Sequence, residues 1–170
     1  STTASDSVML GTTAGDAITT GTSNTGVGAD VMSSTTTGDF NVAMGNSALG
    51  ANTTADNNTA IGFFSMLLNT TGTGNAAVGR DSLRCNTTGN NNSALGKDAL
   101  KLNTTASSNT AVGNSTLTTN TTGASNTAVG AGAMFANTTG ASNTAVGVDA
   151  LPANTTGAEN VAVGADALKA

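Results

Sequence analysis

The sequence lacks tryptophan, tyrosine and histidine altogether, and its 170 residues include one cysteine, one proline and four phenylalanines. Without histidine, a conventional catalytic triad and a histidine-ligated metal site are both excluded. A single cysteine, Cys85, excludes an internal disulfide framework. Aromatics at 2% of the residues are too few for an ordinary globular core, in which each large buried side chain contributes about 1.5–3 kcal/mol. We therefore expect neither an enzyme nor a cofactor.

Charged residues are also scarce, at 9%, and the net charge is −5. Nucleic-acid binding needs clustered basic residues, and five Lys and Arg in the whole chain do not supply them. No apolar run approaches the ~20 residues that a membrane span requires. The sequence contains no recognisable signal peptide, which a mature chain would already have lost. We expect no nucleic-acid partner and no membrane insertion.

An internal repeat of 17 residues accounts for the whole chain. The segments N-T-A-V-G that begin at Asn109, Asn126 and Asn143 show the spacing, and its extension in both directions gives the unit N-T-A-V-G-x-x-A-L-x-x-N-T-T-G-x-x. No insertion interrupts it. Composition this biased can also indicate disorder, but disordered chains are usually highly charged and poor in Val and Leu, unlike this one. The pattern is typical of a repeat protein.

The fifth position of the unit is glycine in every copy, at Gly11, Gly28, Gly45, Gly62, Gly79, Gly96, Gly113, Gly130, Gly147 and Gly164. A fixed period without insertions is expected if each unit is one coil of a solenoid, because equivalent residues then stack at about 4.7–4.9 Å. Helical solenoids use units of about 33 residues or more. We predict an all-β fold, a single-stack parallel β-solenoid or β-roll of ten coils that forms one domain over residues 1–170. The glycines would occupy a turn with positive φ or a close approach.

Other rows of the repeat have expected places in such a coil. The aliphatic residues before the glycines and the Leu or Met residues at position nine are expected to fill the interior. The paired threonines are expected to form a short strand, one side chain inward and one outward. Asparagine suits stacked amide ladders at turns. The stretches Asp98-Ala99-Leu100, Asp149-Ala150-Leu151 and Asp166-Ala167-Leu168 could instead form one helical turn per coil.

The segment S-N-T-A-V-G-x-x-A resembles the head repeat of trimeric autotransporter adhesins, in which an S-V-A-I-G-like element recurs. The longer N-T-A-V-G…A-L…N-T-T-G pattern also resembles repeat shafts of phage tail fibres and bacterial surface fibres. The resemblance covers the chain and implies a stacked parallel β-roll, a surface fibre and often a homotrimer. The 17-residue unit is longer than that of the adhesins, and no heptad stalk or membrane anchor accompanies it. The resemblance implies a left-handed coil, whereas right-handed crossovers are the general rule.

The two ends of the sequence match in register. Ala170 occupies position eleven of the unit and Ser1 occupies position twelve, so Ser1, Thr2 and Thr3 would continue the ladder beyond Leu168 and Ala170 of another copy. Solenoids normally end in polar capping repeats, and the last copy is close to the consensus. These ends predict head-to-tail stacking with copies of the same chain, or a piece of a longer array.

Ten asparagines lie in N-x-S/T sequons, the acceptor motif for N-glycans: Asn52, Asn69, Asn86, Asn103, Asn120, Asn137, Asn154, Asn57, Asn91 and Asn114. Seven of them begin N-T-T at the same position of the unit. Either these asparagines form a structural ladder, or the row carries covalent glycans. Both interpretations stay open at this level.

Three further features invite a functional interpretation. Asp81 and Asp98, like Asp149 and Asp166, stack on adjacent coils and could bind Ca²⁺, although Arg80 and Lys97 beside the first pair favour a solvated charge ladder. Cys85 stacks between Leu68 and Leu102, where a small hydrophobic role is favoured over a reactive thiol. Phe63 and Phe64, with Met66, Leu67 and Leu68, could form a docking patch for a neighbouring chain or a local packing cluster; Phe40 and Phe135 are the other rings.

The sequence thus predicts a structural subunit of an extracellular or cell- or virion-surface fibre, assembled from copies of itself end to end, laterally as a homotrimer, or both. An adhesin or tail-fibre shaft that binds a host surface is the first alternative. An ice-binding solenoid is the second, because threonine recurs regularly, although adjacent threonines allow only one outward row.

Overall fold

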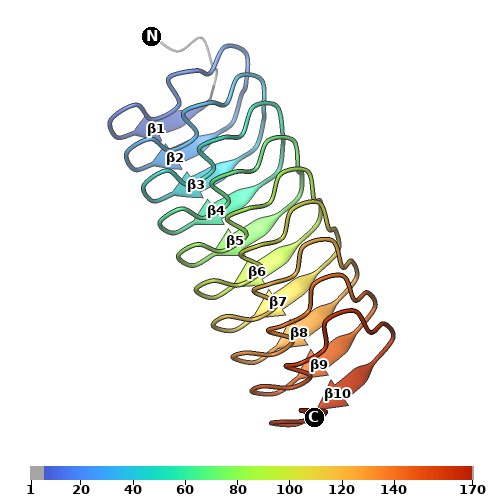
Figure 1. The fold of residues 1–170 in the computed structure, drawn as a ribbon. Coiled ribbons are helices and arrows are strands. Elements are labelled where there is room, and N and C mark those ends of the chain that lie inside the picture. The colour runs from blue at the N-terminus through green and yellow to red at the C-terminus, as the bar shows by residue number, and fades with distance from the viewer. Residues whose placement is uncertain (1–5, 170) are drawn as a thin grey trace.

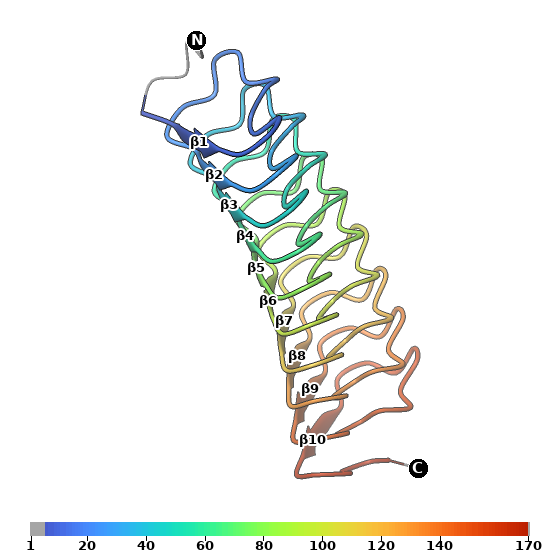
Figure 2. The same cartoon turned by 90° about the vertical axis from the view of Figure 1, so that its left-hand side faces the viewer.

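The computed structural model describes residues 6–169 and confirms an all-β solenoid. Ten three-residue strands, β1 to β10, lie at Val8–Leu10, Thr25–Val27, Val42–Met44, Thr59–Ile61, Ala76–Val78, Ser93–Leu95, Thr110–Val112, Thr127–Val129, Thr144–Val146 and Val161–Val163. They form one parallel sheet in chain order. Figures 1 and 2 show the coils stacked along one axis, with the strands lined up on one side of the rod. We number the rungs after their strands.

The register between neighbouring strands is a shift of one repeat at every step. Thr110 pairs with Thr127, Ala111 with Ala128 and Val112 with Val129, and the other strand pairs follow the same pattern. The strand sequence Thr-Ala-Val combines β-branched residues with a small one, and β-branched residues pack well on a pleated surface. Identical side chains therefore lie above one another along the rod.

The glycine after each strand turns the chain sharply. These ten glycines have φ between +122° at Gly164 and +141° at Gly11, which L side chains rarely adopt. A Cβ on Gly96 would lie 2.3 Å from the carbonyl oxygen of Gly113 on the next rung. Both the backbone conformation and the close approach therefore require glycine here.

Only one of the two apolar rows that the sequence predicts for the interior lies there. Leu100 and its equivalents at position nine from Met32 to Leu151 are buried, as predicted, and they pack against the alanines of position three, such as Ala94 and Ala111. Leu168 on the last rung is 57% exposed. The prediction that the aliphatic residue before the glycine faces inward is wrong: Leu95 is 51% exposed and Val146 38%. In a three-residue strand only the middle side chain points inward, because neighbouring side chains alternate between the two faces.

Two rows of asparagine complete the interior. The Nδ2 of Asn103, at position twelve, donates to Oδ1 of Asn86 on the preceding rung at 2.9 Å and to the carbonyl oxygen of Ala106 at 3.0 Å. The Nδ2 of Asn92, at position one, donates to the same carbonyl oxygen at 2.9 Å and to Oδ1 of Asn75 at 3.1 Å. The predicted amide ladders are present, and each carries its hydrogen bonds inside the rod.

The paired threonines do not form a strand, so that prediction is wrong. Thr104 and Thr105 lie in a bend, where Thr104 is half-buried and Thr105 is exposed. The cause is Asn103, whose side chain turns inward and hydrogen-bonds the carbonyl group three residues later. Such a local side-chain contact competes with extended structure and curves the backbone. The hydroxyl group of Thr104 instead donates to the carbonyl oxygen of Thr121 at 3.1 Å.

The alternative of a helical turn after each glycine is also wrong, because residues 6–169 contain no helix. In the hairpin loop at positions six to eleven, Asp98 has φ +58° and Leu100 has φ +50°. Their equivalents on every rung share this left-handed conformation, which is uncommon for residues other than glycine. Hydrogen bonds between rungs hold it, such as the bond from the Leu100 amide group to the carbonyl oxygen of Thr116 at 3.0 Å.

Candidate functional site

The outward face of the sheet, which we call the strand face, carries two rows of side chains. Position four supplies an unbroken aliphatic row: Leu10, Val27, Met44, Ile61, Val78, Leu95, Val112, Val129, Val146 and Val163. Position two supplies Thr, Val, Ala or Ser on each strand. Neither row contains a charge. The position-four row is therefore a straight apolar stripe that continues over all ten strands, beside a row in which six of the ten residues are Thr or Ser.

The size of this stripe marks it as a candidate contact surface. Ten strands at about 4.8 Å spacing make it about 43 Å long, and two outward rows about 7 Å apart make it about 10 Å wide. The whole strand face of ~430 Å² is comparable in size with the ~300–600 Å² of the largest apolar patches on soluble monomers, which are often functional, and its position-four row is apolar throughout. This surface was not expected from the sequence, because the aliphatic row was predicted to fill the interior. The alternation of Thr, Ala and Val was the signal that could have revealed it.

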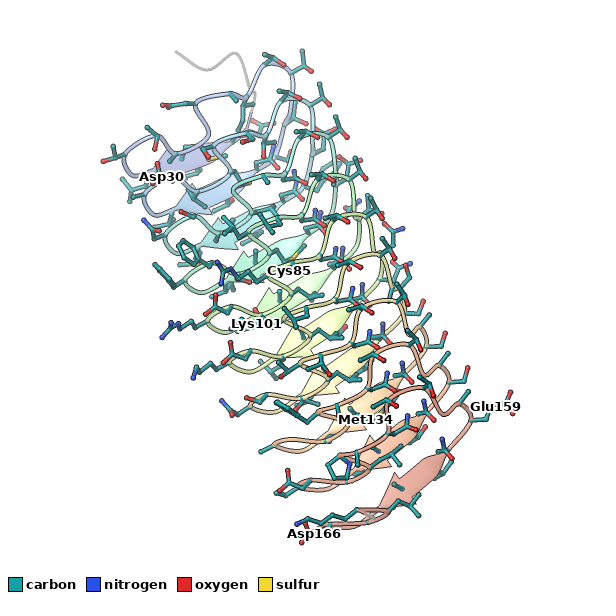
Figure 3. All side chains as sticks on the ribbon, in the orientation of Figure 1. Asp30, Cys85, Lys101, Met134, Glu159 and Asp166 are labelled. Carbon is teal, nitrogen blue, oxygen red and sulfur yellow. The ribbon has the colours of Figure 1, made fainter. Side chains whose placement is uncertain are left out.

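The second departure from a uniform polar coat lies on the edge formed by the hairpin loops. We call this the hairpin edge (Figure 3). Rungs 5 and 6 carry four of the chain's five cationic side chains there: Arg80, Arg84, Lys97 and Lys101. Arg80 and Lys97 are 63% and 55% exposed.

Aromatic rings adjoin these cations on rung 4. Phe63 and Phe64 lie with their ring centroids 3.8 Å apart, and the Cζ atoms of Arg80 and Arg84 lie 5.9 and 5.3 Å from the Phe63 and Phe64 centroids. The two rings therefore pack against each other and take part in cation–π contacts. Phe63 itself remains 44% exposed.

The stacked aspartates of this edge are engaged in ion pairs. Asp81 lies 3.1 Å from Nε of Arg80 and 3.5 Å from Arg84, and Asp98 lies 3.0 Å from Nζ of Lys101. Burial raises the pKa of the Asp98 carboxyl group, but the hydrogen bonds and charges of Lys101 and Lys97 outweigh burial and hold the pKa below its ordinary value of 3.8. Among residues 6–169 no group of three His, Cys, Asp or Glu side chains could hold a metal ion.

Asp149 and Asp166, the other stacked pair, lie on rungs 9 and 10. Asp166 forms an ion pair with Lys169 at 2.7 Å.

Cys85 is a free thiol, half-buried between the partly exposed Leu68 and Leu102, as its repeat position indicates.

The sequons divide into two structural groups. Six of the asparagines that begin N-T-T, from Asn52 to Asn137, are fully buried, and Asn154 is half-buried on the last complete bend. A glycan on Nδ2 of Asn103 would replace one of the two N–H groups that donate its hydrogen bonds and would have to fit inside the rod. By contrast, Asn57, Asn91 and Asn114 are exposed, so only these three present an accessible acceptor in the folded rod.

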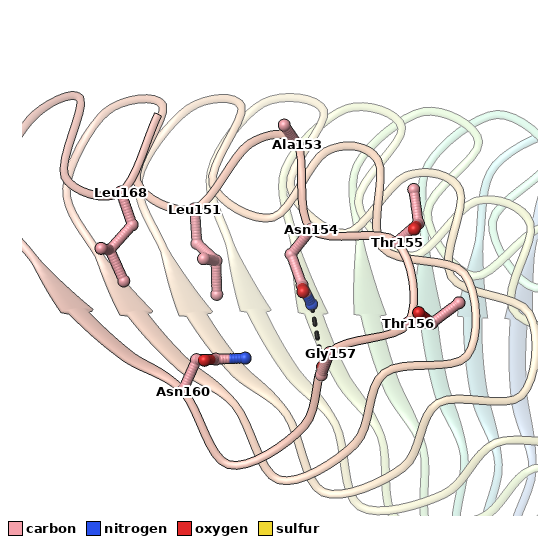
Figure 4. Close-up of a pocket in the computed structure, with 8 residues that line it drawn as sticks. All are labelled: Leu151, Ala153, Asn154, Thr155, Thr156, Gly157, Asn160 and Leu168. Atoms are coloured by element: carbon pink, nitrogen blue, oxygen red, sulfur yellow. Dashed lines mark hydrogen bonds between the residues drawn. The ribbon is translucent and has the colours of Figure 1, made fainter. Parts of the chain in front are cut away.

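The far end of rung 10 carries a shallow hollow (Figure 4). Its walls include Leu151, Asn154, Thr155, Gly157 and Leu168. A further bend stacked on residues 154–159 would occupy this hollow at the spacing of the rungs. Ser1, Thr2 and Thr3, expected to supply such a bend from another copy, lie outside the described residues, as does Ala170; Leu168 is 57% exposed.

Comparison with known proteins adds nothing to these surfaces, since no family model, curated protein or solved structure matches the chain. Within residues 6–169, no helix has the length and hydropathy needed to cross a membrane.

Proposed function

We propose that this chain is a structural subunit of an extracellular or surface fibre, without enzymatic activity, in which copies pack side by side through the strand face. The observation that carries the proposal is the uncharged aliphatic row on all ten strands. Exposed apolar surface of this extent is unfavourable in water, and burial is worth about 25 cal/mol per Å². Its contact with other copies removes this cost.

A second copy is a better partner for this stripe than an unrelated surface. The aliphatic side chains repeat at the rung spacing, so ridges of one stripe fit between those of another only if both have the same rise. Flat sheets with identical small side chains form dry interdigitated contacts on this principle. A lateral assembly of two or three rods, with the polar bends and hairpin loops outside, meets this requirement, and the trimer is the arrangement that the adhesin-like repeat implies.

End-to-end contact is the second element of the proposed assembly. The amide and carbonyl groups on the outer side of rung 10 have no further rung among the described residues, and the hollow there accepts another bend. A bend from another copy would continue the stack of rungs. Glycans on Asn57 and Asn91 would project from the bends of such a fibre, whereas Asn114 lies on the hairpin edge of rung 7.

The test is light scattering after size exclusion, with negative-stain microscopy of the same sample. We expect assemblies of two or more copies, and rods wider than one solenoid. The variant Val112→Thr, Val129→Thr, Val146→Thr keeps the side-chain shape but lowers hydrophobicity, so it should dissociate laterally while its circular dichroism is retained. Thr88→Ser, Thr105→Ser, Thr122→Ser on the exposed bend is the matched control. A wild-type chain that stays a single narrow rod would refute lateral packing.

An ice-binding role is a second candidate, because the position-fourteen threonines, such as Thr88 and Thr105, form one exposed row at the rung spacing. The outward strand rows do not add a second threonine row, since Val42, Ala76 and Val161 interrupt it. Thermal hysteresis measured at high protein concentration decides this candidate, and its absence removes it.

A further inference from the structure

The charges of the hairpin edge are not distributed like the repeat. Net positive charge lies on rungs 5 and 6, where Arg80, Arg84, Lys97 and Lys101 surround two aspartates. Acidic residues of the same edge lie on rungs 1 and 2 (Asp16 and Asp30) and on rungs 9 and 10 (Asp149 and Asp166). Rung 10 also carries Lys169, which pairs with Asp166, so the net negative charge at that end comes from Asp149. Each acidic pair is therefore four rungs from the cationic pair, one on either side. Figure 3 shows Asp30, Lys101 and Asp166 along this edge.

We propose that the hairpin edge is a contact surface for a second copy of this chain, parallel to the first and displaced by four rungs. In this arrangement rungs 5 to 10 of one copy face rungs 1 to 6 of the other. The displacement corresponds to about 19 Å at the strand spacing of a sheet. This contact lies on a different side of the rod from the strand face and does not depend on it.

Charge complementarity selects the displacement. With no displacement, Arg80 and Lys97 would face their own equivalents, and like charges repel. With four rungs of displacement, Lys97 and Lys101 face Asp30 of the second copy, and Arg80 and Arg84 face Asp16. The same shift brings Asp149 of the first copy opposite the arginines of the second. Exposed ion pairs are individually weak and screened by salt, so the contact gains strength from repetition along a rod.

The apolar residues of the edge fit the same displacement. Phe63 and Phe64 on rung 4 then face rung 8, which presents Ala131, Gly132 and the 45% exposed Phe135. Gly132 is the one glycine at its repeat position among the ten rungs, and the side chain of Asp149 on the next rung lies over it. Phe135 supplies an aromatic partner, and such pairs prefer offset or edge-to-face contact.

An antiparallel contact between rungs 1 to 6 of both copies would also bring unlike charges together. It would, however, place Phe63 and Phe64 against Asn46 and Ser47 of rung 3, which are polar. The parallel displaced arrangement matches both the charges and the aromatic rings.

Zero-length carbodiimide cross-linking of an equal mixture of ¹⁴N- and ¹⁵N-labelled protein tests this arrangement, because the reagent joins only lysines and carboxylates in contact. We expect heavy–light links from Lys97 or Lys101 to Asp30 and to Asp166, reduced at least tenfold in 1 M salt. Links to both Asp30 and Asp166 distinguish the polarity, since an antiparallel overlap of rungs 1 to 6 leaves out rung 10 and one of rungs 5 to 10 leaves out rung 2. Same-copy links of Lys101 to Asp98 and Lys169 to Asp166 serve as internal references.

Four outcomes would overturn the proposal. The first two are same-copy links alone and heavy–light links of Lys101 to Asp98, which require zero displacement. The other two are heavy–light links to Asp16 without Asp166, which indicate the antiparallel contact of rungs 1 to 6, and heavy–light links to Asp166 without Asp30, which indicate an antiparallel contact of rungs 5 to 10. The variant Arg80→Glu, Arg84→Glu should abolish the heavy–light links, and added Asp16→Lys and Asp149→Lys should restore them. Lys97, Lys101, Asp30 and Asp166 remain in both variants, so the readout is unchanged. Glu159→Gln, on the exposed bend outside the hairpin edge, is the control.

Discussion

Replacement of Gly113 by alanine tests the stacked architecture most directly. Gly113 has φ +137°, and a Cβ there would lie 2.7 Å from both the carbonyl carbon and the carbonyl oxygen of Gly130, and 2.8 Å from Oγ1 of Thr116. The neighbouring rung cannot move away freely, because the Gly130 amide group donates to the carbonyl oxygen of Val112 at 2.8 Å. The substitution therefore adds backbone strain and a collision between rungs.

Gly164 separates these two effects within the same chain. Its φ is +122°, but a Cβ there would meet nothing within 4 Å. Backbone strain of about 1–3 kcal/mol applies to both glycines, whereas overpacking of about 1–3 kcal/mol applies only to Gly113. We expect Gly113→Ala to lower the free energy of unfolding by about 2–6 kcal/mol, and Gly164→Ala by about 1–3 kcal/mol.

Thermal unfolding followed by circular dichroism measures the difference. For a chain of this length 1 kcal/mol corresponds to a shift in Tm of about 2–4 °C. Hydrogen exchange locates the effect, because repeat proteins open in local units, and we expect lost protection on rungs 7 and 8 in Gly113→Ala. Equal losses of Tm in the two variants would refute the close approach between rungs, and two unchanged variants would refute the turn itself.

Three further substitutions probe the interior and the ion pairs. Asn103→Asp puts a carboxylate against the acceptors of the asparagine ladder, and urea titration should show a loss of more than about 3 kcal/mol at pH 7 that shrinks on acidification; a loss that is independent of pH would contradict the ladder. Leu100→Ala should cost about 2–5 kcal/mol in the same assay, and the 40% exposed Leu102 serves as its control, since Leu102→Ala should change stability by less than about 0.5 kcal/mol. The folded pKa of Asp98 lies below its unfolded value, so its ion pairs stabilise the fold above pH ~3.8, and this stabilisation is lost as pH falls through the folded pKa. Asp98→Asn should therefore be less stable than wild type at pH 7 and converge with it in acid, and a pH-independent gap would show that the lysines do not act on this carboxyl group.

Part of the fold was readable from the sequence because the rows are identical. A 17-residue period without insertions implies that every rung has the same shape, and only stacking explains why Gly113 and its equivalents never vary. Leu100 and its row were placed inside correctly, because a narrow coil needs one large apolar residue per rung. The amide ladders were predicted for the same reason, since asparagine recurs at positions one and twelve.

The tertiary structure alone decided which side of each row faces the core. The period fixes what lies above Val112 but not whether its side chain points in or out, and a three-residue strand centred on Ala111 turns it outward. Likewise, Thr104 and Thr105 have strand propensity, but the inward side chain of Asn103 bends them. A local preference worth a fraction of a kcal/mol yields to an asparagine that satisfies buried carbonyl groups on every rung.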